Sequence, residues 1–549
     1  MTTEVTRDIA VSATGLLRDF SEFGVLTWAD VHPAQHLAFL YGEGDDRVKL
    51  ALALTVRALR AGSLCVDLAA VVTDGFADET GAVDVPEGVW PPLDEWLDAV
   101  RQSPCVTDGD GPTEQPRPFR LVGGLLYLER YYDDQETVRD LLLDRLDQVS
   151  IIAGGPGTGK TYRIGLLVAE ALSADPRPLI ALAAPTGKAA ARMTSSLQES
   201  AALSAPELSG HAAGLAASTI HRLLGPLPGS RGRFRHNAGN PLPHDLVIID
   251  EMSMVSMTLM ARLMEALKPS ARLVLVGDPD QLASVEAGSV LADLTTGAKS
   301  AALVTRLTEQ HRFSGHLSEL AEAIRSGDAD AALDLLTSSA TVRLLAPDDA
   351  LADLREDTVS QGAAMFDAAR AGDADAAVAA LHRHRLLAGH RHGEFGVSHW
   401  TRTVQGWLTD DVPGFSMDAE FYLGRPVMIT TNLADLGLFN GDTGVIVAGP
   451  EGAPRAVFET GPGKAYSPYV LSDLQSVHAM TVHKSQGSQF ATVSLILPPL
   501  DSPLLTRELL YTAVTRAEHD VLVVGTPDAV RSAVERPARR TSGLADRLA

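Results

Sequence analysis

The sequence contains few cysteines. Cys65 and Cys105 are the only two, and they form no CxxC pair and have no third or fourth ligand at zinc spacing. We therefore expect two thiols in a reducing compartment. Acidic or cysteine partners at ligand spacing are also missing around a cluster of four histidines, His382, His384, His390 and His392. We predict no metal site at either place.

Basic residues are outnumbered by acidic ones. The formal net charge is -24, from 46 Lys and Arg against 70 Asp and Glu. A protein that binds DNA through a general cationic surface needs clustered Lys and Arg to neutralise phosphates, so this composition excludes that class. Any DNA-binding groove must be local.

The signals that send a chain to a membrane are absent as well. The first ten residues, MTTEVTRDIA, show no basic segment followed by an apolar one, and no run of about 18 apolar residues occurs. We therefore predict a cytoplasmic protein without membrane contact. Its 549 residues, of which 45% are hydrophobic, predict about three or four folded domains.

The hydrophobic pattern divides the chain into three parts. Residues 1–133 contain long apolar-periodic runs and predict a mainly helical N-terminal domain, with residues 103–119 as a polar loop. From about residue 149, the short apolar runs VSIIA, LIALAA, LVIID and LVLVG alternate with helical segments, which is typical of a parallel sheet with crossover helices. The later runs PVMITT, VSLIL and DVLVVG predict a second α/β domain. We assign the two α/β domains to residues 134–298 and 299–549.

A glycine-rich segment directly follows the run VSIIA and precedes a helical segment. It comprises Gly154, Gly155, Pro156, Gly157, Thr158, Gly159, Lys160 and Thr161. Glycines in this pattern let main-chain N–H groups wrap phosphates at the start of a helix. We expect Lys160 to reach the β- and γ-phosphates and the Thr161 hydroxyl to bind Mg²⁺. The segment therefore predicts ATP and Mg²⁺ as cofactors.

Acidic and amide side chains follow two of the predicted strands. Asp250 ends the run LVIID, and Glu251 comes next. At the carboxyl end of such a strand, Asp250 would lie near the metal, while Glu251 would orient or deprotonate the attacking water. Gln281, just past the run LVLVG, can hydrogen-bond both the γ-phosphate and the water. These residues extend the prediction from nucleotide binding to hydrolysis.

Two arginines further along the chain could assist phosphoryl transfer. Arg312 lies in LTEQHRF and Arg516 in LLYTAVTRA. The transfer spreads charge over the γ-oxygens, so cations delivered from an opposing domain would accelerate it and couple it to domain closure. A lone arginine in a helix is usually a surface residue, so this interpretation depends on its context.

That context is a resemblance to a known family. In order, the segments GGPGTGKT, APTGKAAARM, STIHRLLG, IIDEMSM, VGDPDQLASVEAG, LTEQHRF, AMTVHKSQGSQF and LLYTAVTRA resemble the consecutive motifs of superfamily 1 helicases of the 5′-to-3′ subclass. Beyond these motifs, residues 149–549 are similar to the RecD family, the alpha subunits of the RecBCD exodeoxyribonuclease V complex. The resemblance implies an α/β fold with two RecA-like P-loop domains, which face each other across ATP while single-stranded DNA crosses both.

The resemblance also implies roles for individual residues. The catalytic set is Lys160, Glu251, Gln281, Arg312 and Arg516, and the Mg²⁺ ligands are Thr161 and Asp250. The expected DNA contacts are residue types that suit backbone contact rather than base reading, which a motor moving over any sequence needs. They are Pro185, Thr186, Lys188, Thr219, His221, Thr481, His483 and Lys484.

Two insertions and an adenine contact complete this comparison. The basic, glycine-punctuated stretch around residues 226–243 resembles a small pin beside the DNA path, where Arg231, Arg233 and Arg235 would face phosphates. The short strands of about residues 431–477 predict an inserted β-barrel that looks like the SH3-like subdomain of this subclass. The family usually has a longer connection before the phosphate loop, with a glutamine that reads adenine. Here the connection is short, and Gln135 and Gln148 are both candidates.

The function implied by the resemblance is that of an ATP-dependent 5′-to-3′ DNA helicase and translocase. It would act within a RecBCD-like heterotrimer that processes double-strand breaks for homologous recombination, on single-stranded and duplex-end DNA and with RecB-like and RecC-like partners. Residues 1–133 resemble the domain that docks RecD on RecC. No nuclease motif is visible, so cleavage would belong to a partner. Two alternatives stay open: a stand-alone helicase of the same subclass, and a nucleotide-bound structural or regulatory subunit.

Overall fold

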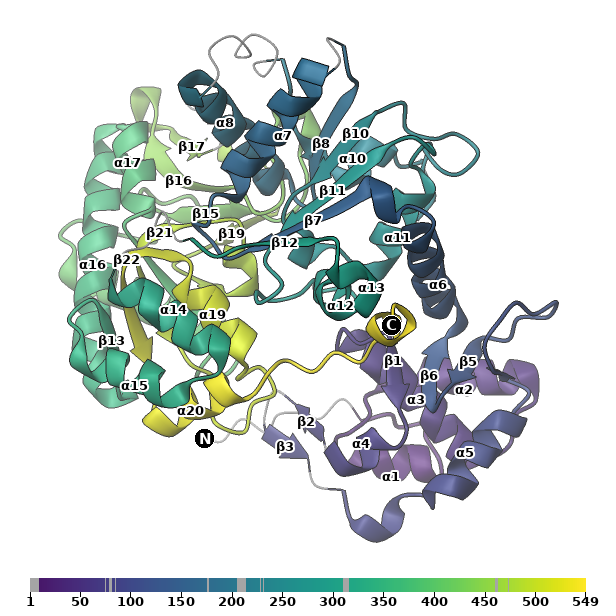
Figure 1. Cartoon of the computed structure of the whole chain (residues 1–549). Coiled ribbons are helices and arrows are strands. Elements are labelled where there is room, and N and C mark those ends of the chain that lie inside the picture. Colours follow the sequence, from purple (N-terminus) through teal and green to yellow (C-terminus); the bar gives the residue numbers. More distant parts are fainter. Residues whose placement is uncertain are drawn as a thin grey trace.

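A computed structural model describes most of the chain. It covers residues 9–74, 76–78, 81–83, 85–174, 177–204, 214–227, 229–230, 232–309, 315–459, 463–471 and 473–549. Arg231 and Arg312 lie outside these described residues. Two α/β domains lie side by side, and the N-terminal domain lies beneath the first of them (Figure 1). We refer to them as α/β domain 1 and α/β domain 2.

The N-terminal domain combines helices with a small mixed sheet. Its helices are α1 (Leu16–Glu22), α2 (Trp28–Tyr41), α3 (Asp46–Arg60), α4 (Ala70–Asp74) and α5 (Leu93–Gln102). Its four-stranded sheet has the order β1 (Cys65–Asp67), β6 (Leu125–Leu128), β5 (Phe119–Val122) and β4 (Val106–Asp108), and a separate hairpin joins β2 (Phe76–Asp78) and β3 (Gly81–Val83). The large side chains Phe20, Trp96 and Phe119 fill its core.

The prediction of a mainly helical domain is therefore incomplete. The stretch predicted as a loop, residues 103–119, contributes β4 and the first residue of β5, which pair in parallel. Strands of three or four residues are too short to show the alternation by which a strand is recognised. The two cysteines, Cys65 and Cys105, are both free and buried.

Helix α6 (Glu129–Leu143) connects the N-terminal domain to α/β domain 1. It runs without a break across the predicted boundary at residue 133 and packs against α11 (Met257–Glu265). Asp134 on α6 accepts hydrogen bonds from Arg262 and Thr258, both at 2.7 Å. The helix therefore belongs with α/β domain 1.

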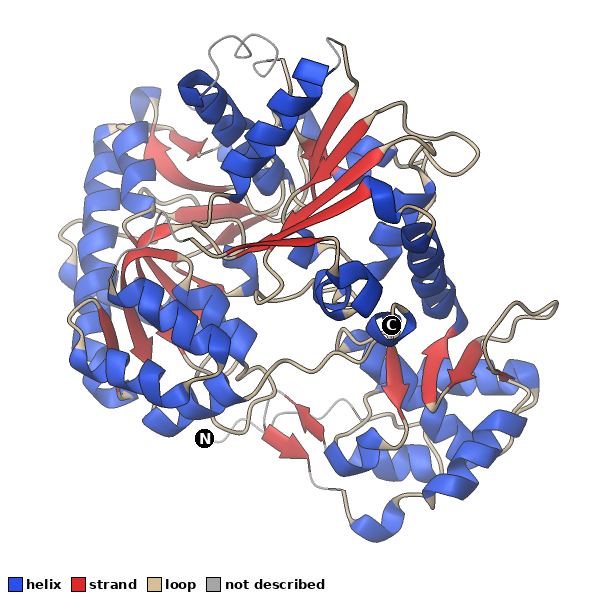
Figure 2. Ribbon diagram, viewed as in Figure 1, coloured by secondary structure: helices blue, strands red, loops and turns tan. Residues whose placement is uncertain are grey.

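The sheet of α/β domain 1 is parallel, as the sequence predicted, and it has six strands, of which four correspond to the predicted apolar runs. Their order is β12 (Val304–Leu307), β7 (Val149–Gly154), β11 (Arg272–Gly277), β10 (Leu246–Ile249), β8 (Ile180–Ala184) and β9 (Ser218–Thr219). One face packs on α6, α11 and α12 (Val290–Thr296), and the other on α7 (Lys160–Ala174) and α8 (Gly187–Ser204) (Figure 2). The short helices α10 (Ile220–Leu224) and α13 (Ala298–Ala301) complete the domain. Because β12 pairs with β7, this sheet extends beyond the predicted boundary at residue 298.

The sheet of α/β domain 2 has five parallel strands. Their order is β13 (Val342–Leu345), β22 (Ala517–Val524), β21 (Phe490–Ile496), β14 (His384–Ala388) and β20 (Ala479–Thr481). One face packs on α14 (His316–Ser326), α15 (Ala329–Ser338), α19 (Arg507–Val514) and α20 (Pro527–Glu535). The other packs on α16 (Pro347–Ala371) and α18 (Val397–Asp411), while α17 (Ala374–Leu381) packs against α16.

An antiparallel sheet is inserted into α/β domain 2. Its order is β18 (Ala465–Tyr466), β17 (Pro454–Phe458), β16 (Thr443–Ala448), β15 (Pro426–Ile429) and β19 (Leu474–Ser476). The run PVMITT, predicted as a strand of the parallel sheet, instead forms β15 of this insertion. A fully buried four-residue strand reads the same in either sheet, so its sequence could not distinguish them. We call residues 426–476 the inserted sheet.

The stretch predicted as a pin begins with a hairpin-like turn. Pro226 and Phe234 form an antiparallel bridge, and the N–H of Arg235 donates to the carbonyl of Gly225 at 2.7 Å. Arg233 and Arg235 are exposed. The stretch therefore projects arginines from α/β domain 1.

The last residues of the chain return to α/β domain 1. After α20, residues 536–549, which we call the C-terminal tail, run back beneath both domains and end in α21 (Leu544–Arg547) (Figure 1). Leu544 and Leu548 are fully buried in the core of α/β domain 1. The carbonyl of Thr541 accepts a hydrogen bond from the N–H of Leu64 at 2.8 Å, so the tail also contacts the N-terminal domain.

Within the described ranges, no helix has both the length and the apolar character needed to cross a membrane.

Candidate functional site

The glycine-rich loop lies between β7 and α7. Gly157 and Gly159 have φ angles of 84° and 80°, in the left-handed region that favours glycine. The ammonium group of Lys160 donates to the carbonyls of Gly154 and Gly155 at 2.6 and 3.0 Å. The Thr158 hydroxyl donates to the Gly155 carbonyl at 2.8 Å. The loop thus curls around the lysine, as a phosphate-binding loop requires.

The acidic pair lies two strands away from this loop in the same sheet, at the end of β10. The N–H of Glu251 donates to a carboxylate oxygen of Asp250 at 2.8 Å. Glu251 has a φ of 54°, a left-handed conformation that costs energy for a residue with a side chain and that often occurs at functional sites. Burial raises the pKa of Asp250, and the negative charge of Glu251 raises it further, whereas Lys160 and Arg192 lower it. The carboxylate therefore depends on nearby cations to stay ionised.

Gln281 follows β11, the strand between β7 and β10. Its side-chain N–H donates to a carboxylate oxygen of Asp278 at 3.0 Å, and both residues are buried. The next N–H, that of Leu282, donates to the Thr512 hydroxyl of α19 at 2.9 Å. The segment that carries Gln281 is therefore attached directly to α/β domain 2.

Arg516 approaches the same place from α/β domain 2. It is 3% exposed, and its guanidinium donates to the carbonyls of Thr512 and Ser488 at 3.1 and 3.4 Å. Burial lowers the pKa of Arg516, while the negative charge of Glu251 acts in the opposite direction. The guanidinium thus lies within electrostatic reach of the acidic pair.

One cavity of about 380 Å³ collects these groups from both α/β domains. Ten of the predicted site residues line it: Gly155, Pro156, Gly157, Gly159, Lys160, Thr161, Asp250, Glu251, Gln281 and Arg516. Arg312, the other predicted arginine, cannot be placed because it falls outside the described residues. The cavity therefore unites two cations of domain 1, Lys160 and Arg192, and two carboxyl groups of that domain with an arginine of domain 2.

Gln135 does not reach this cavity. It is fully buried on α6, and its side-chain carbonyl accepts a hydrogen bond from the N–H of Gly543 in the C-terminal tail at 3.1 Å. Gln148 lies at the start of β7, whereas the phosphate loop follows the end of that strand. The prediction that Gln135 contacts adenine is thus wrong in this structure, because the tail occupies its side chain.

Five residues that line the cavity were not predicted: Ala189, Arg192, Met193 and Ser196 on α8, and Gln489 directly before β21. Arg192 and Gln489 are the two whose side chains interact across the two domains. The signal for Arg192 was present in APTGKAAARM, because it lies one helical turn after Lys188 and therefore on the same face of the helix. Gln489 likewise lies in a quoted motif, AMTVHKSQGSQF.

The predicted DNA contacts lie at the carboxyl ends of strands in both sheets. Pro185 and Thr186 follow β8, Thr219 ends β9, and Thr481 ends β20. In α/β domain 1, this is the same sheet edge that carries the nucleotide cavity after β7, β10 and β11. The cavity and the predicted DNA contacts of α/β domain 1 therefore lie along one edge of the same sheet.

The predicted cationic DNA contacts have protein partners here. The Lys188 ammonium lies 3.1 Å from a carboxylate oxygen of Glu459 in α/β domain 2, and that of Lys484 donates to the side chain of Gln475 at 2.6 Å. Burial lowers the pKa of His483 to about 4, so its ring is neutral at physiological pH. His221 is exposed and lies next to Phe234 of the hairpin-like turn, with ring centroids 5.8 Å apart.

The four clustered histidines have separate partners. His384, His390 and His392 are hydrogen-bonded to Ser494, Ser502 and Ser398 at 2.9, 3.0 and 3.4 Å, and His382 lies 3.3 Å from Glu459. Within the described part of the chain, no group of three or more His, Cys, Asp or Glu side chains is arranged to hold a metal ion.

Three protein-family models match the chain. The N-terminal domain of the RecBCD enzyme subunit RecD matches residues 22–127, an AAA domain matches residues 130–347, and a UvrD-like helicase C-terminal domain matches residues 476–524. The RecBCD enzyme subunit RecD of Mycolicibacterium smegmatis is 45% identical over 97% of this chain and 99% of its own length. The chain belongs to the RecD family. It is accordingly a helicase of superfamily 1 that binds ATP.

The chain is also similar, over less of its length, to two proteins that are named as helicases. The ATP-dependent RecD2 DNA helicase of Deinococcus radiodurans is 32% identical over 80% of this chain and 54% of its own length. Among solved structures, the Pif1 helicase from Bacteroides in complex with ADP-AlF3 and ssDNA aligns with 72% of this chain and 93% of its own, at 16% identity and a TM-score of 0.38.

Proposed function

We propose that this RecD-family chain is the 5′-to-3′ ATP-driven motor of a RecBCD-type heterotrimer. With RecB-like and RecC-like partners, it would process duplex ends at DNA double-strand breaks for homologous recombination. One observation carries this proposal: Lys160 and Glu251 of one α/β domain and Arg516 of the other line a single cavity. Hydrolysis in such a cavity is tied to relative movement of the two domains, because the catalytic set is complete only when they meet.

Each residue of the cavity has a task in this proposal. Lys160 would bind the β- and γ-phosphates, and Glu251 would orient the attacking water and accept its proton. Gln281, which Asp278 holds in place, would contact the γ-phosphate and convey its presence through Leu282 to Thr512 of α/β domain 2. Arg516 would stabilise the charge that develops on the transferred phosphoryl group.

The donor set of the cavity fits Mg²⁺. Thr161 supplies a hydroxyl oxygen and Asp250 a carboxylate oxygen on the wall that also carries Lys160. Mg²⁺ prefers oxygen ligands and commonly binds through one or two protein groups together with phosphate oxygens. When bound, it would neutralise phosphate charge, and Asp250 would need to be ionised to hold it.

ATP turnover with and without single-stranded DNA tests this function. We would measure it for the wild-type chain and for Lys160→Gln, first alone and then with RecB-like and RecC-like subunits. DNA-stimulated turnover that is lost in the variant supports the motor, and stimulation that appears only with the partners supports the heterotrimer. Absence of DNA-dependent turnover in both settings would favour a nucleotide-bound structural subunit.

Strand polarity needs a separate measurement. A duplex with either a 5′ or a 3′ single-stranded tail should be unwound by the assembled complex from the 5′ tail when the RecB-like motor is inactivated. Unwinding by the chain alone would favour a stand-alone helicase, and dependence on a 3′ tail would contradict the proposed direction.

A further inference from the structure

Arg192 is a second arginine, besides Arg516, that lines the nucleotide cavity, and the motor scheme above gives it no role. It lies on α8 of α/β domain 1, the same domain as the phosphate loop, so it is not an arginine supplied by the opposing domain. Its positive charge lowers the pKa of Asp250 and that of Arg516, which indicates that it is close to both. The residue is thus placed where the two domains and the nucleotide meet.

The guanidinium of Arg192 holds a segment of the other domain. It donates to the carbonyl of Gly487 at 3.2 Å and to the side-chain carbonyl of Gln489 at 2.7 Å. The same segment is attached to α/β domain 1 at a second point, where the side chain of Gln486 donates to the carbonyl of Leu282 at 2.8 Å. Residues 486–489 are therefore fastened on one side by Arg192 and on the other by the residue that follows Gln281.

Segment 486–489 connects the cavity to the predicted DNA contacts of α/β domain 2. It directly follows Thr481, His483 and Lys484, and it leads into β21 at the centre of the sheet. A displacement of this segment would therefore also move the predicted DNA contacts that precede it in the chain.

Helix α8 makes a second link of the same kind. Lys188 and Arg192 are separated by one helical turn and lie on one face of α8. Lys188 reaches Glu459 of the inserted sheet, while Arg192 reaches segment 486–489. Two cations on one rigid helix thus contact α/β domain 2 at two points. The same helix begins at predicted DNA contacts.

The partners of Arg192 are neutral. Among the described residues, no carboxylate lies within ion-pair distance of it, and its two acceptors are a main-chain carbonyl and an amide oxygen. A guanidinium binds phosphate oxygens more strongly than neutral acceptors, because the hydrogen bonds are then charge-assisted. Phosphate in the cavity would accordingly compete with Gln489 for this side chain.

We propose that Arg192 is a positioning residue that couples nucleotide occupancy to the DNA-contacting segment of α/β domain 2. ATP draws the guanidinium away from Gln489, segment 486–489 is released, and the affinity for single-stranded DNA changes with the nucleotide state. This inference rests on the proposed motor function. It adds a second route from nucleotide to DNA, beside the one through Gln281 and Thr512.

The affinity for single-stranded DNA, measured on the full chain with and without a non-hydrolysable ATP analogue, tests this coupling. The ratio of the two dissociation constants is the coupling factor, which is commonly about 5- to 150-fold in coupled proteins. We expect Arg192→Gln to lower this ratio to the part that the route through Gln281 and Thr512 carries. Arg192→Lys should give a ratio between that of Arg192→Gln and that of the wild type, because lysine lacks the forked donor geometry. Arg101→Gln, which removes an exposed arginine paired with Asp98 in the N-terminal domain, is the matched control and should keep the full ratio.

Substitutions of Gln489 separate competition from simple nucleotide binding. Gln489→Glu places a carboxylate beside Arg192, so ATP must compete with an ion pair and its KM should rise. Gln489→Leu removes the acceptor, so the KM for ATP should stay the same or fall while the coupling ratio still declines. In the double variant Arg192→Gln/Gln489→Leu, the loss of coupling should not exceed that of Arg192→Gln alone, since both act on one contact.

The possible outcomes differ for the coupling and for the motor. Wild-type ATP turnover that DNA does not stimulate, alone or with partners, would reject the motor function and this inference with it. If the wild type is stimulated but Arg192→Gln keeps the wild-type coupling ratio, only the inference is overturned. The inference is also overturned if Arg192→Gln weakens nucleotide binding but leaves the ratio unchanged, because Arg192 is then a nucleotide ligand alone.

Discussion

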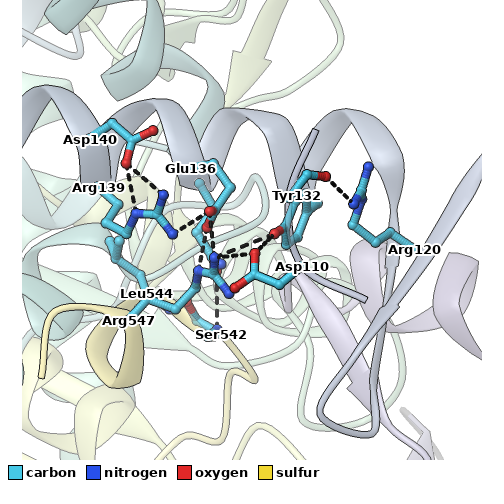
Figure 3. A network of polar contacts seen from close by, with 12 residues as sticks. Asp110, Arg120, Tyr132, Glu136, Arg139, Asp140, Ser542, Leu544 and Arg547 are labelled. Carbon is cyan, nitrogen blue, oxygen red and sulfur yellow. Dashed lines mark hydrogen bonds and ion pairs between the residues drawn. The ribbon is translucent and has the colours of Figure 1, made fainter. Parts of the chain in front are cut away.

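Two clusters of charged residues lie where distant parts of the chain meet, and their charges are balanced in opposite ways. In the nucleotide cavity, Lys160 and Arg516 donate to main-chain carbonyls, and the Asp250 carboxylate accepts a hydrogen bond from the main-chain N–H of Glu251. At the C-terminal tail, Arg547 is surrounded by acidic groups: it pairs with Asp110 at 2.7 Å and with Glu136 on α6 (Figure 3). The charges of the nucleotide cavity therefore remain available to a ligand, whereas those of the tail cluster neutralise one another.

The pKa shifts of Asp110 and Asp250 follow the same division, whereas burial raises the pKa of Glu136 in the tail cluster despite the opposing charge of Arg547. Arg547 and the hydroxyl of Tyr132 lower the pKa of Asp110 to about 2, so the tail cluster favours its ionised carboxylate. Burial raises the pKa of Asp250 in the cavity. A cluster whose members neutralise one another stabilises the fold, whereas a cluster that keeps charges apart is prepared for a charged ligand. Substitutions in the first should change stability, and those in the second should change activity.

The largest effect is expected for Arg516→Gln. An arginine supplied across a domain contact accelerates phosphoryl transfer by about 10³-fold or more, so turnover at saturating ATP and DNA should fall by at least that factor. The free energy of unfolding should change much less, because glutamine can still donate to the neighbouring carbonyls. Turnover and thermal unfolding measured on the same preparation check both parts. A fall in turnover of less than about tenfold would remove Arg516 from the catalytic set.

The next largest effect is expected for Glu251→Gln. A positioned general base contributes about 10²- to 10⁴-fold, so turnover should fall within that range while nucleotide binding persists. Binding of a fluorescent ATP analogue, compared with steady-state turnover, separates the two effects. Glu170→Gln, an exposed glutamate on α7, is the matched control and should behave as the wild type. Equal losses of binding and turnover would assign Glu251 to nucleotide binding instead.

The same comparison explains which parts could be predicted from sequence. Lys160, Asp250 and Gln281 are local to strand ends in one sheet, so the position of each in the sequence specifies its position in the cavity. Arg516 was found only through the surrounding motif. Gln135 was misassigned because its environment is set by Gly543, some four hundred positions away in the chain. Contacts of this range leave no periodic or compositional signal.

The fold shows the same limit. The parallel sheets were predicted because their buried strands alternate with helices. The short strands of the N-terminal domain and the pairing of β12 with β7 were not, since neither has an alternating pattern. The C-terminal tail gave no signal, although Leu544 and Leu548 complete the core of α/β domain 1.

Arg547→Ala tests the structural side of the comparison. Its removal leaves Glu136 and Asp110 without their shared cation, so the free energy of unfolding should fall by about 2 kcal/mol. Breaking a fully buried pair costs about 3–5 kcal/mol. The expected loss is smaller here because Asp110 is largely exposed. ATP turnover per folded molecule should change by less than about twofold. Arg101→Ala, which breaks an exposed pair with Asp98, should cost almost nothing in urea unfolding. A large loss of turnover with unchanged stability would reverse the assignment of the tail cluster.

Asp293→Asn is expected to have the smallest effect, and it depends on pH. Asp293 on α12 accepts a hydrogen bond from Ser542 of the tail, and burial raises its pKa to about 7 from its ordinary value near 4. The folded state therefore binds this proton more tightly than the unfolded state, so wild-type stability should fall as the pH rises from about 4 to about 7 and then level off. The variant lacks this titration and should be more stable than the wild type at pH 8, by on the order of 1 kcal/mol, and nearly equal to it at pH 4.5. Urea unfolding at both pH values measures the difference in stability between the variant and the wild type. If the variant is stabilised as much at pH 4.5 as at pH 8, the gain in stability does not come from removing an ionised carboxyl group.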